Sequence, residues 1–131
     1  MKTVLSKRLT REEIVRQAIS GVDVALFYEL TETLKKPEKD LARIINTSLR
    51  TIHNKVNNKE SFDPQTGERL LKLKEMYALG IEYFGNVELF EKWLSEPSWV
   101  SNEKHIALLR TSGGIDLVVD EIERIAQGYV I

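Results

Sequence analysis

Apolar residues recur along this chain at spacings of three and four, as they do on one face of an α-helix. The clearest stripe is the last one, formed by Ile115, Val118, Val119, Ile122 and Ile125. No segment alternates apolar and polar residues with the period of two that is typical of a half-buried strand. The pattern therefore predicts an all-α fold.

Capping residues and breakers set the limits of the predicted helices. Thr10 and Glu13 form a capping box at the start of the first helix, and Gly21 ends it. Asp63 followed by Pro64 begins a long fifth helix. The predicted helices cover about residues 11–20, 24–36, 38–45, 48–58, 64–84, 87–94, 102–110 and 115–127.

The third and fourth helices have the arrangement of a helix-turn-helix in the run DLARIINTSLRTIHNKV. Ala42 is small where the two helices would cross, and Asn46 lies at a turn that needs a positive φ. Ser48 is the expected N-cap of the fourth helix, with Ile52 and Val56 on its buried face.

The other face of residues 47–58 holds many hydrogen-bond donors and no acid. Arg50 could reach a guanine edge or a phosphate, and Asn54 and Asn57 could pair with adenine. The full set of candidate DNA-binding residues is Ser48, Arg50, Thr51, His53, Asn54, Lys55 and Asn57. The alternative is a helical hairpin whose polar face is merely solvated.

The composition excludes every bond and site that needs cysteine. The chain has 131 residues, is 42% hydrophobic and 30% charged, and has no cysteine, so disulfides, zinc–thiolate sites and thiol nucleophiles are excluded. Because no run has the length of a signal peptide core or a membrane span, we expect a cytoplasmic protein that does not enter membranes.

Charge is unevenly distributed. Residues 1–85 hold 15 Lys and Arg against 12 Asp and Glu, a net charge of +3, whereas residues 86–131 hold 4 against 8, a net charge of −4. This asymmetry suggests two functions on one chain. Since a charge of +3 would hold DNA weakly, a DNA-binding form is expected to be a homodimer.

No enzymatic motif is present, so we expect no catalytic residue, metal ligand or cofactor. The sequence lacks a glycine-rich phosphate loop, a serine elbow and a paired-carboxylate motif. His53 and His105 are each isolated from any acid or nucleophile at a fixed spacing. The acids of the last helix are interpreted as a solvated face: Asp116, Asp120, Glu121 and Glu123.

Residues 24–131 resemble the Xre/MbcA/ParS antitoxins. In the first part, SLRTIHNKV corresponds to the recognition helix of the Xre-type helix-turn-helix, and ERLLKL lies in the long helix. In the second part, the resembling features are Phe84-Gly85-Asn86, Trp93-Leu94 with Pro97, Leu108-Leu109, Gly114 and RIAQG at 124–128.

The resemblance implies an antitoxin of a type II toxin–antitoxin system. Residues 1–84 would bind operator DNA and repress the shared operon, and residues 85–131 would bind the toxin. The partner would be a RES-domain toxin, which consumes NAD⁺, and the antitoxin would cover its active site without using NAD⁺ itself. The alternative function is a stand-alone transcriptional regulator whose C-terminal part only dimerises or senses a ligand.

The expected toxin-binding residues are Trp99, Arg110, Tyr129, Val130 and Ile131. Trp99 follows Pro97 in a loop, where it either packs into the local core or anchors an interface. The apolar tail of residues 129–131 lies beyond the stop at Gly128, so it would fray unless another surface covers it.

Overall fold

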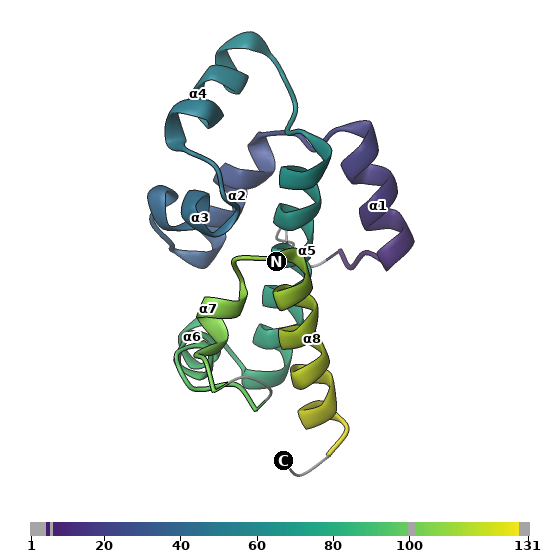
Figure 1. The fold of residues 1–131 in the computed structure, drawn as a ribbon, viewed down its shortest axis with the longest axis vertical. Coiled ribbons are helices and arrows are strands. Elements are labelled where there is room, and N and C mark those ends of the chain that lie inside the picture. Colours follow the sequence, from purple (N-terminus) through teal and green to yellow (C-terminus); the bar gives the residue numbers. More distant parts are fainter. Residues whose placement is uncertain (1–4, 6, 100–101, 129–131) are drawn as a thin grey trace. The chain divides into compact units, whose positions relative to one another are not determined.

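The computed structural model describes residues 5, 7–99 and 102–128, and these residues confirm the all-α fold. Apart from two isolated β-bridges, the described residues form no strand. The helices are α1 (Arg11–Ser20), α2 (Ala25–Leu34), α3 (Glu38–Ile44), α4 (Leu49–Asn58), α5 (Pro64–Phe84), α6 (Val87–Leu94), α7 (His105–Leu108) and α8 (Ser112–Ala126) (Figure 1).

The chain divides into two compact units, residues 1–74 and 75–131. The division lies within α5, so one continuous helix contributes residues to both units. The sequence places the boundary between functional modules at the end of that helix, between residues 84 and 85. The separate functions of the two modules stay a prediction.

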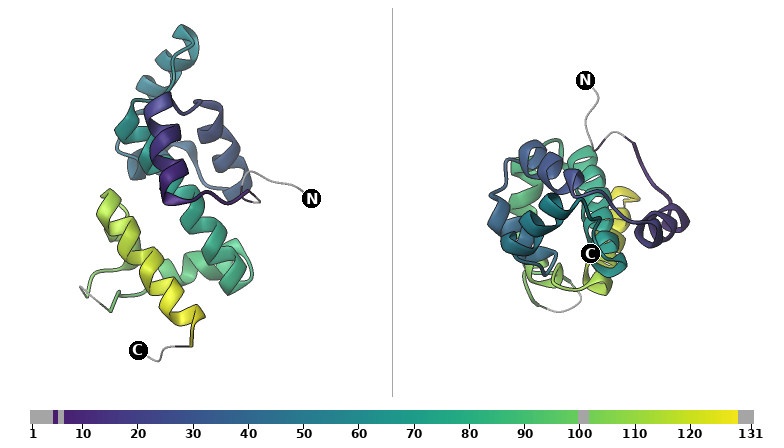
Figure 2. Two further views of the ribbon diagram at one scale, coloured as in Figure 1. Left: turned by 90° about the vertical axis from the view of Figure 1, so that its right-hand side faces the viewer. Right: turned by 90° about the horizontal axis from the view of Figure 1, so that it is seen from above.

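In the first unit, α1 to α4 surround the N-terminal part of α5. Figures 1 and 2 show α1 on one side of α5 and α2 and α3 on the other. An isolated bridge between Val22 and Phe62 joins the α1–α2 link to the α4–α5 link. The buried core comprises Ile14, Ala18, Val22, Val24, Phe27, Leu30, Leu34, Leu41, Ala42, Ile45, Ile52, Phe62, Leu70, Leu71 and Leu73.

In the second unit, aromatic side chains from α5 and α6 pack together. The Phe90 ring stacks on Phe84 and Trp93, at centroid distances of 5.8 and 5.9 Å, and meets the edge of Tyr77 at 5.3 Å. Gly80 permits this packing, because a Cβ at that position would lie 2.4 Å from the Phe90 ring. Tyr77 is fully buried and donates a hydrogen bond to Glu91 Oε1 at 2.5 Å.

The bounds of the last two predicted helices are wrong. The seventh helix covers only His105–Leu108, because Asn102 has φ 61° and Lys104 is bridged to Pro97. The last helix begins at Ser112, because the Thr111 side chain accepts a hydrogen bond from the Gly114 N–H and so caps it. Among the described helices, none is long and apolar enough to cross a membrane.

Candidate functional site

The turn between α3 and α4 has a defined hydrogen-bonded geometry. Asn46 has φ 60°, as the sequence predicts for this position. The Thr47 N–H donates to Ala42 O at 3.0 Å and the Asn46 N–H to Arg43 O at 3.1 Å, which is the Schellman pattern of a helix C-terminus. The same pattern, with Lys35 and Lys59 in the left-handed conformation, ends α2 and α4.

Ser48 begins α4, as predicted. Its hydroxyl accepts a hydrogen bond from the Thr51 N–H at 3.0 Å and lies 2.9 Å from Thr51 Oγ1. The cap satisfies one of the backbone donors that a helix N-terminus leaves unpaired. The cap and the Schellman turn together fix the direction in which α4 leaves α3.

Buried side chains hold the two helices in place. Leu41, Ala42, Ile45 and Ile52 are all buried. The Arg69 guanidinium, from α5, donates to Ile45 O at 3.4 Å and places a cation at the carbonyl end of α3, where it is favourable.

The outer face of α4 is accessible along its length. Six of the seven predicted DNA-binding residues are exposed: Ser48, Arg50, Thr51, His53, Asn54 and Asn57. Lys55 is half-buried, and its ammonium donates to Ser61 O at 3.3 Å, in the link to α5. The prediction that Val56 is buried is wrong, because its side chain is 48% exposed and Ile52 alone on α4 is fully buried.

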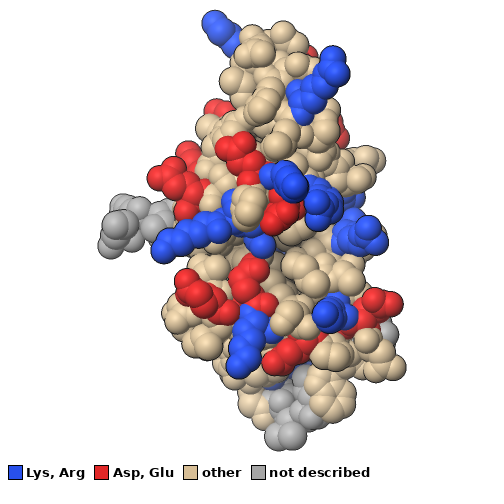
Figure 3. Space-filling view, turned by 90° about the vertical axis from the view of Figure 1, so that its left-hand side faces the viewer, with Lys and Arg blue, Asp and Glu red and all other residues tan. Residues whose placement is uncertain are grey.

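Positive charge is concentrated around α4. Residues 41–59 contain Arg43, Arg50, Lys55 and Lys59 and no acid. The first unit holds 15 Lys and Arg against 10 Asp and Glu, a net charge of +5, and the second holds 4 against 10, a net charge of −6. Figure 3 shows Lys and Arg side chains on a largely uncharged surface at the top of the view, where α4 lies.

A shallow hollow lies beside the α3–α4 turn. Residues of both helices and of the turn line it, among them Lys39, Arg43, Asn46 and Ser48. Lys39 and Arg43 are exposed, so their charges lie next to the N-terminal end of α4. This hollow extends the basic, polar surface from α4 to α3.

The described part of the predicted toxin-binding set is exposed. Trp99 is 63% exposed, so it does not pack into the local core, and Arg110 is also exposed. Tyr129, Val130 and Ile131 lie outside the described residues.

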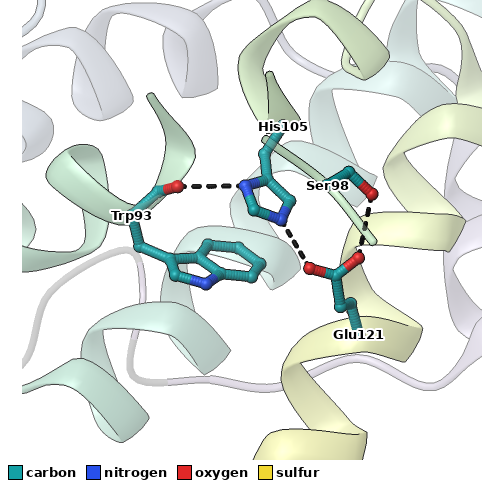
Figure 4. A network of polar contacts seen from close by, with 4 residues as sticks. All are labelled: Trp93, Ser98, His105 and Glu121. Carbon is teal, nitrogen blue, oxygen red and sulfur yellow. Dashed lines mark hydrogen bonds and ion pairs between the residues drawn. The ribbon is translucent and has the colours of Figure 1, made fainter. Parts of the chain in front are cut away.

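The second unit also contains a buried polar cluster (Figure 4), which the sequence does not predict. His105 Nε2 lies 2.5 Å from Glu121 Oε2, and both side chains are 2% exposed. His105 Nδ1 lies 3.0 Å from the carbonyl oxygen of Trp93, which can only accept, so Nδ1 carries a hydrogen. The Ser98 hydroxyl donates to Glu121 Oε1 at 2.9 Å, and the Trp93 ring stacks on the imidazole at 3.7 Å.

This cluster corrects two interpretations of the sequence. His105 is not isolated, and Glu121 does not belong to a solvated face, although Glu123 is exposed. The sequence signal for this burial is the position of Glu121, three residues after Val118 and directly before Ile122, within the buried stripe of α8. Helical spacing thus identifies the buried acid, but only the fold brings His105 to it.

Among the described residues, no group of three or more His, Asp and Glu side chains could hold a metal ion. In comparisons with known proteins, no protein-family model matches this chain, and no curated protein matches it.

Proposed function

We propose that residues 38–58 are a helix-turn-helix that binds DNA by placing α4 in the major groove. One observation carries the proposal. Buried side chains and a helix cap hold the α3–turn–α4 unit on one side, and the other side of α4 is exposed, rich in hydrogen-bond donors and without acids. A recognition helix needs both properties, because it must be rigidly held on one side while the other side meets base edges.

Each exposed side chain suits a particular part of the duplex. Arg50 would contact guanine or a phosphate, and Asn54 and Asn57 would pair with adenine. Ser48 and Thr51, at the N-terminal end of α4, suit phosphates. Lys55 also suits a phosphate, and His53 is exposed on the same helix.

DNA binding would require a homodimer. Each first unit carries a net charge of +5, and the affinity for DNA rises with the number of phosphates neutralised. Two copies would present two recognition helices to two half-sites of an operator.

We further propose that the chain is an antitoxin, and that the acidic second unit neutralises a RES-domain toxin by covering its active site. The exposed Trp99 favours this function, because an accessible Trp is a frequent anchor of protein interfaces. The net charge of −6 suits a toxin pocket with basic residues for a dinucleotide phosphate. In this role the chain itself would have no catalytic activity and no cofactor.

The DNA-binding proposal is tested with the duplex that lies upstream of the gene for this chain. Arg50→Ala combined with Asn54→Ala should weaken binding by roughly 30-fold or more, since each good base contact is worth about 1–3 kcal/mol. The control is Arg16→Ala with Gln17→Ala, which removes exposed polar side chains from α1. Equal affinity of both double variants would refute the role of α4.

The antitoxin proposal is tested against the stand-alone regulator. An antitoxin gene should lie beside a small toxin gene whose product is lethal when expressed alone. The Arg50→Ala, Asn54→Ala variant should still neutralise that product. If the neighbouring product does not bind the intact chain, the regulator is the better account.

A further inference from the structure

The link between α6 and α7 is a hydrogen-bonded loop. Within the described residues, the Ser98 N–H donates to Glu103 O at 2.6 Å and the His105 N–H donates to Glu96 O at 3.0 Å. An isolated bridge joins Pro97 to Lys104. These contacts hold the two described sides of the loop together, residues 95–99 and 102–104.

Two neighbouring residues of this loop have opposite environments. Ser98 is 3% exposed, and its hydroxyl bonds to the buried Glu121, whereas Trp99 is 63% exposed. Glu121 is held in turn by His105, which is fixed by the carbonyl oxygen and the stacked ring of Trp93. A chain of contacts therefore runs from α6, α7 and α8 to the residue directly before the exposed Trp.

We infer that Glu121 and His105 are positioning residues, which hold Ser98 so that Trp99 is presented in a fixed direction to a protein partner. The inference rests on the proposed partner-binding function and adds residues that act through Trp99 without touching the partner. A side chain ordered before binding loses less entropy when the complex forms, and so the cluster raises affinity.

The partner surface that fits is an apolar pocket with a basic rim. Glu96 and Glu103 are exposed on the two sides of the loop that carries Trp99. The second unit as a whole has a net charge of −6, which opposes both nucleic acid and the same surface of a second copy.

The chain offers a matched pair of substitutions at Glu121. In Glu121→Gln, the amide oxygen can still accept from Ser98, and the amide N–H can donate to His105 Nε2. In Glu121→Leu, neither contact can form. Ser98→Ala removes the bond from the loop to Glu121, and its control is Ser95→Ala, whose hydroxyl donates to Lys92 O on the surface.

The first measurement uses the chain alone. The ¹⁵N heteronuclear NOE of the Trp99 indole N–H and of the loop amides reports their order on the nanosecond timescale. We expect wild type, Glu121→Gln and Ser95→Ala to be ordered, and Glu121→Leu and Ser98→Ala to lose order while keeping their helical circular dichroism. Ser98→Ala keeps the test valid if Glu121→Leu unfolds. Unchanged order in Ser98→Ala would overturn the inference.

The second measurement is the affinity of each variant for the product of the neighbouring gene. Trp99→Ala should weaken binding by roughly 30-fold or more, as expected of an interface anchor. Glu121→Leu and Ser98→Ala should weaken it by about 3- to 10-fold, and Glu121→Gln should retain it. In the Trp99→Ala background, Ser98→Ala should have no further effect, because a positioning residue acts only through the side chain that it positions.

Several outcomes would overturn the inference. Additive losses in the Trp99→Ala, Ser98→Ala double variant would make the cluster merely structural. If Trp99→Ala lost self-association or DNA binding while its affinity for the partner was unchanged, Trp99 would bind a second copy of the chain or DNA and not the proposed partner. Failure of the wild-type chain to bind the neighbouring product would refute the proposed partner function itself, and this result is distinguishable because it appears before any variant is compared.

Discussion

The two units of this protein use polar side chains in opposite ways. In the first, α4 exposes Arg50, Asn54 and Asn57 on a face without acids. In the second, His105 and Glu121 are buried and bonded to each other. An exposed donor remains available to DNA, whereas a buried and satisfied pair cannot reach a ligand and instead fixes the chain around it. Polar character alone therefore does not identify a binding site, and exposure must be known as well.

We expect the largest loss of stability when the buried side of α4 is disturbed. Ile52→Ala removes the fully buried side chain of α4 and should lower the free energy of unfolding by about 4 kcal/mol, through lost burial and the cavity left behind. Val56→Ala is the control, because that side chain is 48% exposed. Urea denaturation of both variants measures the difference, and equal losses would contradict the packing of α4.

A second substitution disturbs packing in the second unit. A Cβ on Gly114 would lie 1.8 Å from Leu108 O, so Gly114→Ala should destabilise the second unit by about 3 kcal/mol. Gly113→Ala is the matched control, since no heavy atom lies within 4 Å of its Cβ position. Unfolding is followed by tryptophan fluorescence, because both tryptophans lie in this unit. Similar midpoints for the two variants would contradict the close approach of Gly114 to Leu108 O.

A third prediction concerns pH and another buried polar contact. Burial, the charge of Glu91 and the hydrogen bond to it raise the pKa of Tyr77 above its usual value. Because the folded pKa is raised, this contribution to stability is fully present below about pH 10, the pKa of an unfolded Tyr, and is lost as the pH rises further. Tyr77→Phe should destabilise by about 2 kcal/mol at pH 7.

The pH dependence separates this contact from simple packing. Above pH 10 the wild-type chain should lose about 1.4 kcal/mol per pH unit more than Tyr77→Phe does. Denaturation at pH 7, 10 and 11 measures the gap between the two proteins. A gap that stays constant over this range would contradict a raised pKa at Tyr77.

The smallest losses of stability are expected when either of two helix caps in the first unit is removed. Ser48→Ala and Thr10→Ala each remove a side-chain cap and should each lower stability by about 1 kcal/mol. Only Ser48→Ala should also weaken DNA binding, because Ser48 belongs to the proposed DNA-binding set of α4 and Thr10 does not. If both substitutions reduced DNA affinity equally, the effect would come from stability alone.

The sequence predicts the first unit more completely than the second. Local signals decide its features, such as the Thr10 capping box, the positive φ of Asn46 and the Asp63 side chain that accepts from the Thr66 N–H. Each depends on residues a few positions apart. The sequence predicts the inward face of α4 less well, because a spacing of four from Ile52 puts Val56 on the same side of the helix but does not determine whether another side chain covers it.

The buried cluster depends on distant residues and so could not be predicted from local spacing. His105 and Glu121 are sixteen positions apart in the sequence, and their contact arises only when α7 and α8 pack together. The sequence predicts a break over residues 111–114, between the last two helices, but Thr111 caps α8 and Gly114 lies against Leu108 O. The Thr111 cap is a local signal of the same kind as the Thr10 capping box, whereas the contact of His105 with Glu121 follows from tertiary packing that a one-dimensional pattern does not contain.

In the proposed function, α4 binds DNA and the polar cluster of the second unit does not. The most direct test is a ¹⁵N–¹H chemical-shift titration of the intact chain with the duplex upstream of its gene. We predict that the largest changes fall on residues 48–57 and that residues 95–121 change little. Changes concentrated in residues 95–121, or the absence of any change in α4 on binding, would contradict this assignment of DNA binding to the first unit.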